Sequence, residues 1–550
     1  MTTKTNNNAT LKVFQNRTYR TLWSASLVSN FGAMIQLVGA GWLMTFLTSS
    51  QSMVALVQSS VTLPIMLMSL SAGVLADNFD RRKVMLVAQV FMALVSAVLA
   101  VLGLLGLLTP WLLLSFTFLI GCGTALHNPS WQSSINELVP REDLPSAVAL
   151  NAMGMNLTRS VGPAVGGAIV AVAGAGAAFT LNAVSYLALI AALVMWRKPP
   201  VVRRLPRERF DSAFAAGLRY FSMSPNLLRT TLRGFLFGFA GVAMQALMPL
   251  IVRDQLGGGA IVFGFLLGSF GLGAVTGALM SARIRARFAN ETICRTGFAG
   301  FAAASVIVGL SGHVALSAPA IFFAGACWLN TLSLLNVTVQ LSSPRWVLGR
   351  MLSLYMTGLF GGMASGSWVA GAISDAHGLH IAFMVSAAIL VCGALWGLHA
   401  PLPEFGALNL DPLNRFNEPA LRLDLKERSG PIKIMVHYDI AEEDVAEFLA
   451  TMAERRRIRR RDGARNWALL RDLENPDIWI ETYHVPTWTE YVRHNERRTV
   501  ADADVSERLR ALHRGPQPMR VQRTIERPAI RTGEELHRID PAAHPLPPVH

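Results

Sequence analysis

Residues 73–83 read Gly73-Val-Leu-Ala-Asp77-Asn-Phe-Asp80-Arg81-Arg82-Lys83, a short charged stretch between two long apolar ones. No charged residue occurs in 53–76 before it or in 84–110 after it. About 20 mostly apolar residues are enough for a helix to cross a bilayer. The sequence therefore predicts a tight basic loop between two membrane-spanning helices.

This loop resembles the one that joins the second and third helices of major facilitator transporters, whose pattern is Gly-x-x-x-Asp-x-x-Gly-Arg-Arg-Lys. The chain matches the pattern at Gly73, Asp77, Arg81, Arg82 and Lys83. It departs at Asp80, where the family usually has glycine. The resemblance implies that Asp77 latches a cytoplasmic gate by contacting a late helix that begins near Arg345–Arg350. The alternative is a basic loop that only sets topology, with an incidental aspartate.

Composition divides the chain into two parts. The 550 residues are 52% hydrophobic and 15% charged, whereas an average soluble protein has about 25% charged residues. Residues 1–400 hold 25 of the 49 Lys and Arg residues but only 10 of the 35 Asp and Glu residues. The basic excess lies in loops between apolar stretches, so we assign it to membrane topology and exclude nucleic acid as a partner. A membrane domain followed by an aqueous domain is expected.

Twelve apolar stretches are long enough to span a bilayer. They fall at approximately 21–48, 53–76, 84–107, 111–131, 146–173, 177–196, 228–252, 260–282, 293–313, 317–340, 347–374 and 379–399. The long connection 197–227 divides them into six plus six. A faint second copy of the basic loop follows span 8, with Ser281 where Asp77 stands. Two six-helix halves with corresponding loops suit a transporter built from repeats.

The distribution of basic residues predicts the orientation. Lys and Arg residues gather at the N-terminus, in the even-to-odd loops and in 197–227, whereas the opposite loops hold only Arg253. The positive-inside rule then places both termini in the cytoplasm, and we expect a multi-pass protein of a bacterial inner membrane. The polar N-terminus has no feature of a cleavable signal peptide. Segment 207–227 has amphipathic spacing and is expected to lie along the cytoplasmic membrane surface.

Span 5 contains a second motif, Arg159-Ser-Val-Gly162-Pro163-Ala-Val-Gly166-Gly167. An arginine within a membrane span is costly and is a functional hypothesis by default. Glycines allow close helix approach, and a proline allows a bend. The run resembles the fifth-helix motif of drug and metabolite exporters, which implies export. The alternatives are a snorkelling Arg159 and glycines that serve only helix packing.

Uncharged polar residues in the spans are candidates for the transport pathway. On spans 1, 7 and 10, which line the cavity in the family, they are Asn30, Gln36, Gln245 and Asn336. Each is alternatively an interhelical hydrogen-bonding group. No Asp or Glu lies well inside spans 1, 4, 7 or 10, so proton coupling is implied by the resemblance alone. His127 near the end of span 4 is a possible protonatable group, although a lone histidine is more often structural.

The last 150 residues are expected to form a linker and a soluble domain. The order of apolar alternation and helical pattern from Ile432 to about 526 is β-α-β-β-α-β, as in ferredoxin-like domains. It is similar to domains of the antibiotic-biosynthesis-monooxygenase type, which the transmembrane secretion effector branch, including enterobactin-exporter-like proteins, carries as a tail. Trp488, Tyr491 and His494 are either pocket residues or ordinary core. The run Arg455–Arg461 is either a headgroup-binding surface or a solvated face.

The predicted fold is thus an all-α membrane protein of major facilitator type, with twelve transmembrane helices in two six-helix halves and a C-terminal α+β ferredoxin-like domain. The predicted parts are the cytoplasmic N-terminus (1–20), the N-terminal bundle (21–196), the amphipathic linker (197–227), the C-terminal bundle (228–400), a linker (401–430), the soluble domain (431–527) and a disordered tail (528–550).

The predicted function is export of a small, amphipathic molecule such as a siderophore, drug or metabolite, by alternating access and proton antiport. The partners are that substrate, the lipid bilayer and protons, with possible self-association through the C-terminal domain. No metal is expected, because the four cysteines have no metal-type spacing. No cofactor is expected, and a membrane-embedded enzyme is rejected because it would need Asp, Glu and His residues clustered at one face, which the spans do not supply. The alternative is a facilitator-fold sensor that signals through its soluble domain.

Overall fold

The structure is a computed structural model. It describes the backbone of residues 13–526 apart from 79, 141–142, 197–209, 345, 405–408, 412, 414–415, 417–418, 420, 424 and 426–428, and it does not describe the side chains of 70–78, 136–137, 145 and 210–213. The predicted tail 528–550 and the side chains of Asp77 and Arg345 therefore lie outside the described part of the chain. The chain forms two compact units, one of Met1–Arg207, Asn226–Gln340 and Gly349–Glu404, and one of Glu208–Pro225, Leu341–Leu348 and Phe405–His550.

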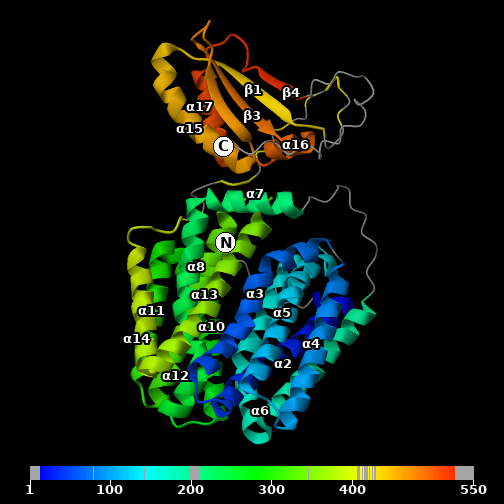
Figure 1. The fold of residues 1–550 in the computed structure, drawn as a ribbon, viewed down its shortest axis with the longest axis vertical. Helices are drawn as coiled ribbons and strands as arrows, with labels where there is room; N and C mark the ends of the chain where they lie inside the picture. The colour runs from blue at the N-terminus through cyan, green and yellow to red at the C-terminus, as the bar shows by residue number, and fades with distance from the viewer. Residues whose placement is uncertain are drawn as a thin grey trace. The chain divides into compact units, whose positions relative to one another are not determined.

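The first unit begins with a bundle of long apolar helices, drawn blue to cyan in Figure 1. Its helices are α2 (Arg17–Leu47), α3 (Gln51–Asn78), α4 (Arg81–Leu104), α5 (Pro110–Leu138) and α6 (Leu144–Met195). Helix starts carry capping side chains: Asn16 accepts from the amide of Tyr19, and Thr109 accepts from that of Leu112 ahead of Pro110. These side chains satisfy amides that lack partners within their helices.

Helix α6 is interrupted at Gly174. The 52-residue element contains one non-helical residue, Gly174, with φ 77° and ψ 173°. An L-residue with a side chain rarely adopts this positive φ, so glycine marks the break. The break falls where the sequence separates span 146–173 from span 177–196. Two helical segments are thus joined at a single non-helical residue, without a regular loop between them.

The second bundle is drawn green to yellow in Figure 1. It consists of α8 (Pro225–Ala246), α9 (Met248–Leu250) with a π-helical turn Ile251–Gln255, α10 (Ala260–Arg287), α11 (Asn290–Leu310), α12 (Val314–Leu341), α13 (Leu348–His377) and α14 (Leu379–Trp396). Ten helical segments in the described residues are long and apolar enough to cross a membrane, with α6 counted as one of them. The 30-residue α13 is not among the ten.

The second unit contains α7 (Phe210–Ser222) and a small antiparallel sheet. The C-terminal elements are β1 (Ile432–Asp439), α15 (Val445–Asp462), β2 (Arg465–Arg471), β3 (Ile478–Val485), α16 (Trp488–Glu496), α17 (Ala503–Leu512) and β4 (Val521–Ile525). The strands pair in the order β2-β3-β1-β4, and each neighbouring pair is antiparallel. Buried and half-buried residues alternate along β1, so one face of this central strand contributes to the core with Phe448 and Trp479.

Candidate functional site: seams between the helical halves and the grip of the C-terminal domain

Helices α3 and α13 form the first seam between the two bundles. Ser59 Oγ donates to the carbonyl of Ala364 at 2.7 Å, and the hydroxyls of Ser69 and Thr357 lie 2.6 Å apart. Closer to the start of α3, a Cβ built on Gly371 would lie 2.6 Å from the Cα of Ser52. Small residues bring the backbones together, and short hydroxyl bonds hold them. Such contacts can form and break without exposing a large apolar surface.

Asp375 closes this seam at the start of α3. Its carboxylate accepts hydrogen bonds from the amides of Gln51 (2.6 Å) and Ser52 (3.0 Å) and from the hydroxyl of Ser50 (3.0 Å). The first amides of a helix have no partner within it and carry the positive end of its dipole. A carboxylate of one bundle thus caps a helix of the other. Asp375 is not among the site residues predicted from the sequence.

Helices α6 and α10 form the second seam, and the Gly-Pro motif lies on it. A Cβ built on Gly167 would lie 2.6 Å from the carbonyl oxygen of Ala260, and one on Gly264 would lie 2.6 Å from that of Pro163. Gly162 and Gly166 instead face α2, where a Cβ would meet Met34 and Ile35. The motif therefore mediates close packing on two sides of one helix.

Arg159 lies one turn before these glycines. Its backbone carbonyl faces Gly271 of α10, where an added Cβ would approach to 2.4 Å. Its side chain is exposed, and within the described part of the chain it has no hydrogen-bonding or ionic partner. A cationic group is thus available beside the seam.

The other polar candidates are not brought together. Gln36 is 4% exposed and accepts hydrogen bonds from Ser96 (3.1 Å) and Asn182, so it links α2, α4 and α6 within the first bundle. This placement fits the alternative of an interhelical hydrogen-bonding group. Asn30, Gln245 and Asn336 are half-buried on α2, α8 and α12. The side chain of Asn336 accepts from Gln340 one turn later, at 2.5 Å.

His127 is buried beside Gln89, with 3.3 Å between His127 Nδ1 and Gln89 Nε2. The contact joins α4 to α5, as expected of a structural histidine.

The basic loop is held by carbonyl groups at helix ends. Arg82 donates to the carbonyl oxygens of Leu193 (2.7 Å) and Val194 (2.8 Å) at the end of α6, and Arg81 donates to that of Ser133 (2.9 Å) near the end of α5. Cations are stabilised at helix C-termini, where carbonyls lack partners. Lys83 is exposed, and Gly73 and Asp77 lie in the last turns of α3.

Asp80 has a structural role. Its side chain accepts from the amide of Arg82 at 2.9 Å and so forms the N-cap of α4. Aspartate is a preferred residue at this position. The departure from the family's glycine thus keeps the turn and adds a cap.

A buried ion pair that the sequence alone does not indicate anchors the chain where it leaves α14. Arg233 is 1% exposed and donates to Glu291 (2.6 Å) and to the carbonyl of Ala400 (2.7 Å). Glu291 also accepts from the amide of Leu402 at 2.8 Å. Arg233 is therefore a hydrogen-bonded core residue.

In the second unit, the guanidinium groups of two arginines of the C-terminal domain lie over two aromatic rings, and we call this pair of contacts the grip. Arg461 lies over the ring of Tyr220 in α7 at 5.3 Å, and Arg497 lies over that of Trp346 in 341–348 at 4.4 Å. The two rings pack edge to face with centroids 5.7 Å apart. Burial raises the pKa of Tyr220 to about 12. Two segments that continue into α8 and α13 are therefore bound to one domain.

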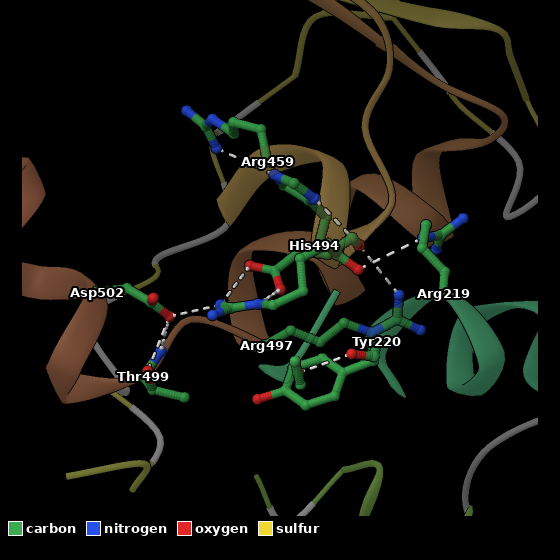
Figure 2. Close-up of polar contacts among 10 residues, drawn as sticks. Arg219, Tyr220, Arg459, His494, Arg497, Thr499 and Asp502 are labelled. Atoms are coloured by element: carbon green, nitrogen blue, oxygen red, sulfur yellow. Dashed lines mark hydrogen bonds and ion pairs between the residues drawn. The ribbon is translucent and has the colours of Figure 1, made fainter. Parts of the chain in front are cut away.

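The guanidinium of Arg461, one of the two arginines of the grip, is held by two carboxylates. Arg461 pairs with Asp462 and Asp502, both at 2.9 Å, and the Asp502 carboxylate also accepts from Thr499. Figure 2 shows Thr499 and Asp502 of this cluster together with Arg219 and Tyr220 of α7. Arg219 Nε donates to the Arg461 carbonyl at 3.4 Å. This network fixes the orientation of the stacking guanidinium.

The domain core contains a buried carboxylate. Glu481 is fully buried and accepts from Arg459, Trp467 and Tyr438, each at 3.0 Å. Burial alone would raise the pKa of Glu481, but Arg459 and Arg455 lower it to about 2. Arg455 and Arg459 are thus core residues, and the prediction of a headgroup surface or solvated face was wrong for these two.

Trp488, Tyr491 and His494 also belong to the domain interior. Trp488 and Tyr491 stack with centroids 5.1 Å apart, and His494 Nε2 lies 3.0 Å from Arg459. All three are buried. Burial and the nearby positive charge of Arg459 hold the pKa of His494 well below its usual value.

The two bundles of long apolar helices have a fold of major facilitator type. A solved peptide transporter of the POT family, in an autoinhibited state, matches with a TM-score of 0.58 and 13% identity over 70% of this chain and 96% of its own. A bacterial homologue of the lysosomal transporter Spinster, inward-facing and occupied, matches with a TM-score of 0.57 and 14% identity over 70% and 96% of the two chains. These likenesses concern the fold.

The family model of transmembrane secretion effectors matches residues 8–530, and the chain belongs to this family of facilitator transporters. It is 24% identical to macrolide efflux protein A of Streptococcus pyogenes over 68% of this chain and 94% of that protein. It is 23% identical to multidrug efflux pump Tap of Mycobacterium bovis, over 72% and 96%. The staphyloferrin A transporter of Staphylococcus aureus is 22% identical over 48% and 66%. The chain is thus a multi-pass membrane protein and a secondary transporter with efflux relatives.

Proposed function

We propose that this protein exports a small, amphipathic molecule across the bacterial inner membrane by alternating access. The observation that carries the proposal is the pair of seams, α3 with α13 and α6 with α10, which join the bundles through glycines, hydroxyls and one capping carboxylate. Polar and small-residue contacts separate at a modest free-energy cost, whereas interdigitated apolar cores do not. Rocking of one half against the other is the motion that such seams permit.

The proposed topology has twelve spans with both termini in the cytoplasm. Counting α6 as two segments about Gly174 and adding α13 to the ten apolar segments supports this number. The basic residues at 81–83 and 283–287 support the orientation. The halves are then 21–196 and 228–400, joined by the linker 197–227.

We further propose that the C-terminal domain, 431–527, is ferredoxin-like and that 401–430 connects it to α14. The antiparallel order β2-β3-β1-β4 with helices after β1 and β3 supports this assignment. Self-association through this domain stays part of the proposal, because domains of the resembling type are dimeric.

The substrate class and the coupling are proposals too. Relatives named for macrolide efflux, multidrug efflux and staphyloferrin A transport support a small organic substrate. We assign the gate to Gly73, Asp77, Arg81, Arg82 and Lys83. Arg159 beside the α6–α10 seam is assigned to the pathway with Asn30, Gln245 and Asn336, and proton antiport is the proposed coupling.

Transport into inverted membrane vesicles tests the proposal. Vesicles from cells that express the chain should accumulate a macrolide or a cationic dye under a pH gradient, acid inside, and lose it when a protonophore is added. Vesicles with Gly264→Leu are the comparison, because a leucine side chain at this position would force α6 and α10 apart. These vesicles should accumulate neither probe. Accumulation that persists after the gradient is collapsed would contradict antiport. Equal accumulation in Gly264→Leu vesicles would contradict alternating access through these seams.

A further inference from the structure

A cavity of about 110 Å³ lies inside the C-terminal domain, between α16, α17 and the segment before β1. One water needs roughly 10–15 Å³ of such space, so the cavity has room for a small organic molecule. Its apolar wall is formed by Leu413, Phe416 and Ala503. The remaining lining residues are Asn495, Arg498, Ser506, Glu507 and Arg510.

Arg498 supplies an unused guanidinium to this cavity. Its backbone is fixed, because its amide bonds to the carbonyl of Asn495 and its own carbonyl accepts from the amide of Leu413 at 3.0 Å. Within the described residues, no carboxylate pairs with its side chain and no acceptor hydrogen-bonds to it. A guanidinium has five N–H donors and cannot lose its proton in a protein. These donors are available to a ligand.

Two arginines, Arg498 and Arg510, and one carboxylate, Glu507, line the cavity, and two more arginines lie near Arg498. Burial and then the neighbouring Arg459 and Arg455 lower the pKa of Arg498 to about 10. Arg455 is buried, and its Nε has no hydrogen-bonding partner within the described part of the chain. Its closest carboxylate oxygen, on Glu481, is 3.8 Å away, and Glu481 is already bonded by three other side chains. An anion in the cavity would offset this repulsion.

We propose that the cavity binds a small organic carboxylate, held by Arg498 and packed against Phe416 and Leu413. The planar fork of an arginine matches the two oxygens of a carboxylate. Apolar walls with a few convergent polar groups are typical of small-molecule sites and disfavour a fully hydrated inorganic ion. Ser506 lies on the same wall and accepts a 2.9 Å hydrogen bond from Arg455, so the hydroxyl orients this side of the site.

The proposed site adjoins the grip on the 341–348 segment. Arg498 follows Arg497, whose guanidinium lies over Trp346 at 4.4 Å. A ligand that orders Arg498 would act on the backbone that positions Arg497. The proposed ligand of this cavity is independent of the transported substrate.

Isothermal titration of the purified full-length protein in detergent tests the site, with sodium benzoate as the probe. Benzamide has the same shape without the charge, and inorganic phosphate has charge without the ring. We expect saturable benzoate binding at one site, with benzamide and phosphate each weaker by on the order of tenfold or more. Equal affinity for benzamide would overturn the carboxylate assignment, and equal affinity for phosphate would overturn the organic class.

Two variants localise the binding. Arg498→Met should weaken benzoate binding by on the order of tenfold or more. Arg508→Met is the control, because Arg508 lies on α17, is exposed and pairs with Glu454 away from the cavity. Unchanged affinity in Arg498→Met would overturn the proposal. If Arg498→Met does not fold, Arg498→Lys takes its place, since it keeps the charge but loses the fork and should also bind more weakly.

Discussion

Asp375, two residues before the end of helix α13 in the second bundle, accepts a 2.6 Å hydrogen bond from the amide of Gln51, the first residue of α3 in the first bundle. The two residues are 324 positions apart. The bond satisfies a helix-end amide of one bundle with a charge from the other, and it joins the bundles at this end. Under the proposed alternating access, this bond has to break when the bundles separate here.

Asp375→Asn should loosen this end of the seam. Hydrogen bonds to a charged group contribute about 1.5–3 kcal/mol, and the amide keeps one acceptor oxygen but no charge. A shift of about 1.4 kcal/mol changes a two-state population tenfold. The probe is Ala55→Cys, one turn into α3 from Gln51, in a cysteine-free background. We expect this cysteine to react several-fold faster with a hydrophilic maleimide in the Asp375→Asn protein than in the parent protein. Ser365→Ala on α13 should leave the rate unchanged, because Ser365 bonds only to carbonyls of its own helix. Equal rates in the Asp375→Asn and parent proteins would show that the hydrogen bond between Asp375 and Gln51 does not hold the bundles together at this end.

Gly167→Ala should damage the α6–α10 seam. Its added Cβ would meet the carbonyl oxygen of Ala260 at 2.6 Å and the Cα of Gly264 at 2.8 Å, and backbone atoms cannot turn aside. Overpacking of this kind costs about 1–3 kcal/mol. We expect a lower midpoint of thermal unfolding in detergent and reduced export. Gly259→Ala is the control, since no atom lies within 4 Å of its Cβ position. Similar losses in both variants would show a general cost of alanine.

Arg82→Ala should destabilise the first bundle more than Lys83→Ala. Arg82 bonds to two carbonyls at the end of α6, whereas Lys83 is exposed and adjacent in sequence. The expected loss for Arg82→Ala is about 1–2 kcal/mol, discounted for partial exposure, and that for Lys83→Ala is within about 0.5 kcal/mol. Chemical unfolding of both purified variants in detergent gives the comparison. If the two variants have the same free energy of unfolding, the hydrogen bonds of Arg82 do not stabilise the bundle, and the basic residues of the loop act only through their charge.

The helices of this chain could be predicted from its sequence better than the contacts between them. Length and apolarity determine a span, so 53–76 predicted most of α3 and 84–107 most of α4. The cap of Asp375 on Gln51 was not predictable, because it depends on how two distant helices meet. The polar residues of a span cannot be assigned to a face without neighbours, which is why Gln36 was proposed for the cavity and lies inside the first bundle.

Two features of the sequence could have indicated structural roles, one for Asp80 and one for Arg455 and Arg459. Asp80 stands directly before the first residue of an apolar helix, which is the pattern of an N-cap. Arg455 and Arg459 are spaced i, i+4 and share a helix face, which can be buried if a carboxylate waits opposite. That carboxylate, Glu481, is on a strand 22 residues beyond Arg459, and only the fold shows that it faces them.

The C-terminal domain should lose stability in two steps as the pH falls. His494 has a folded pKa well below its usual 6.5, so the unfolded chain binds its proton first and stability declines below about pH 6.5. Glu481 has a folded pKa of about 2 against 4.5, so its contribution is complete above pH 4.5 and is lost between 4.5 and 2. Glu481→Gln should remove the lower step and leave Arg459 buried without a counter-charge, a cost of about 3–5 kcal/mol at pH 7. Tryptophan fluorescence during urea unfolding measures both effects, and Glu454→Gln, at an exposed pair, should change neither.

Arg497→Ala should release the 341–348 segment from the C-terminal domain. The guanidinium lies 4.4 Å from the ring of Trp346, and partly desolvated pairs of this kind contribute about 1–2 kcal/mol. We expect amide hydrogen exchange in 341–348 and in α7 to rise several-fold, because Trp346 also packs against Tyr220. Arg493→Ala is the matched control on α16, since Arg493 pairs only with Glu490 on its own helix. If exchange rises throughout the domain, Arg497 supports the fold as a whole, whereas a rise confined to these two segments assigns it to the grip.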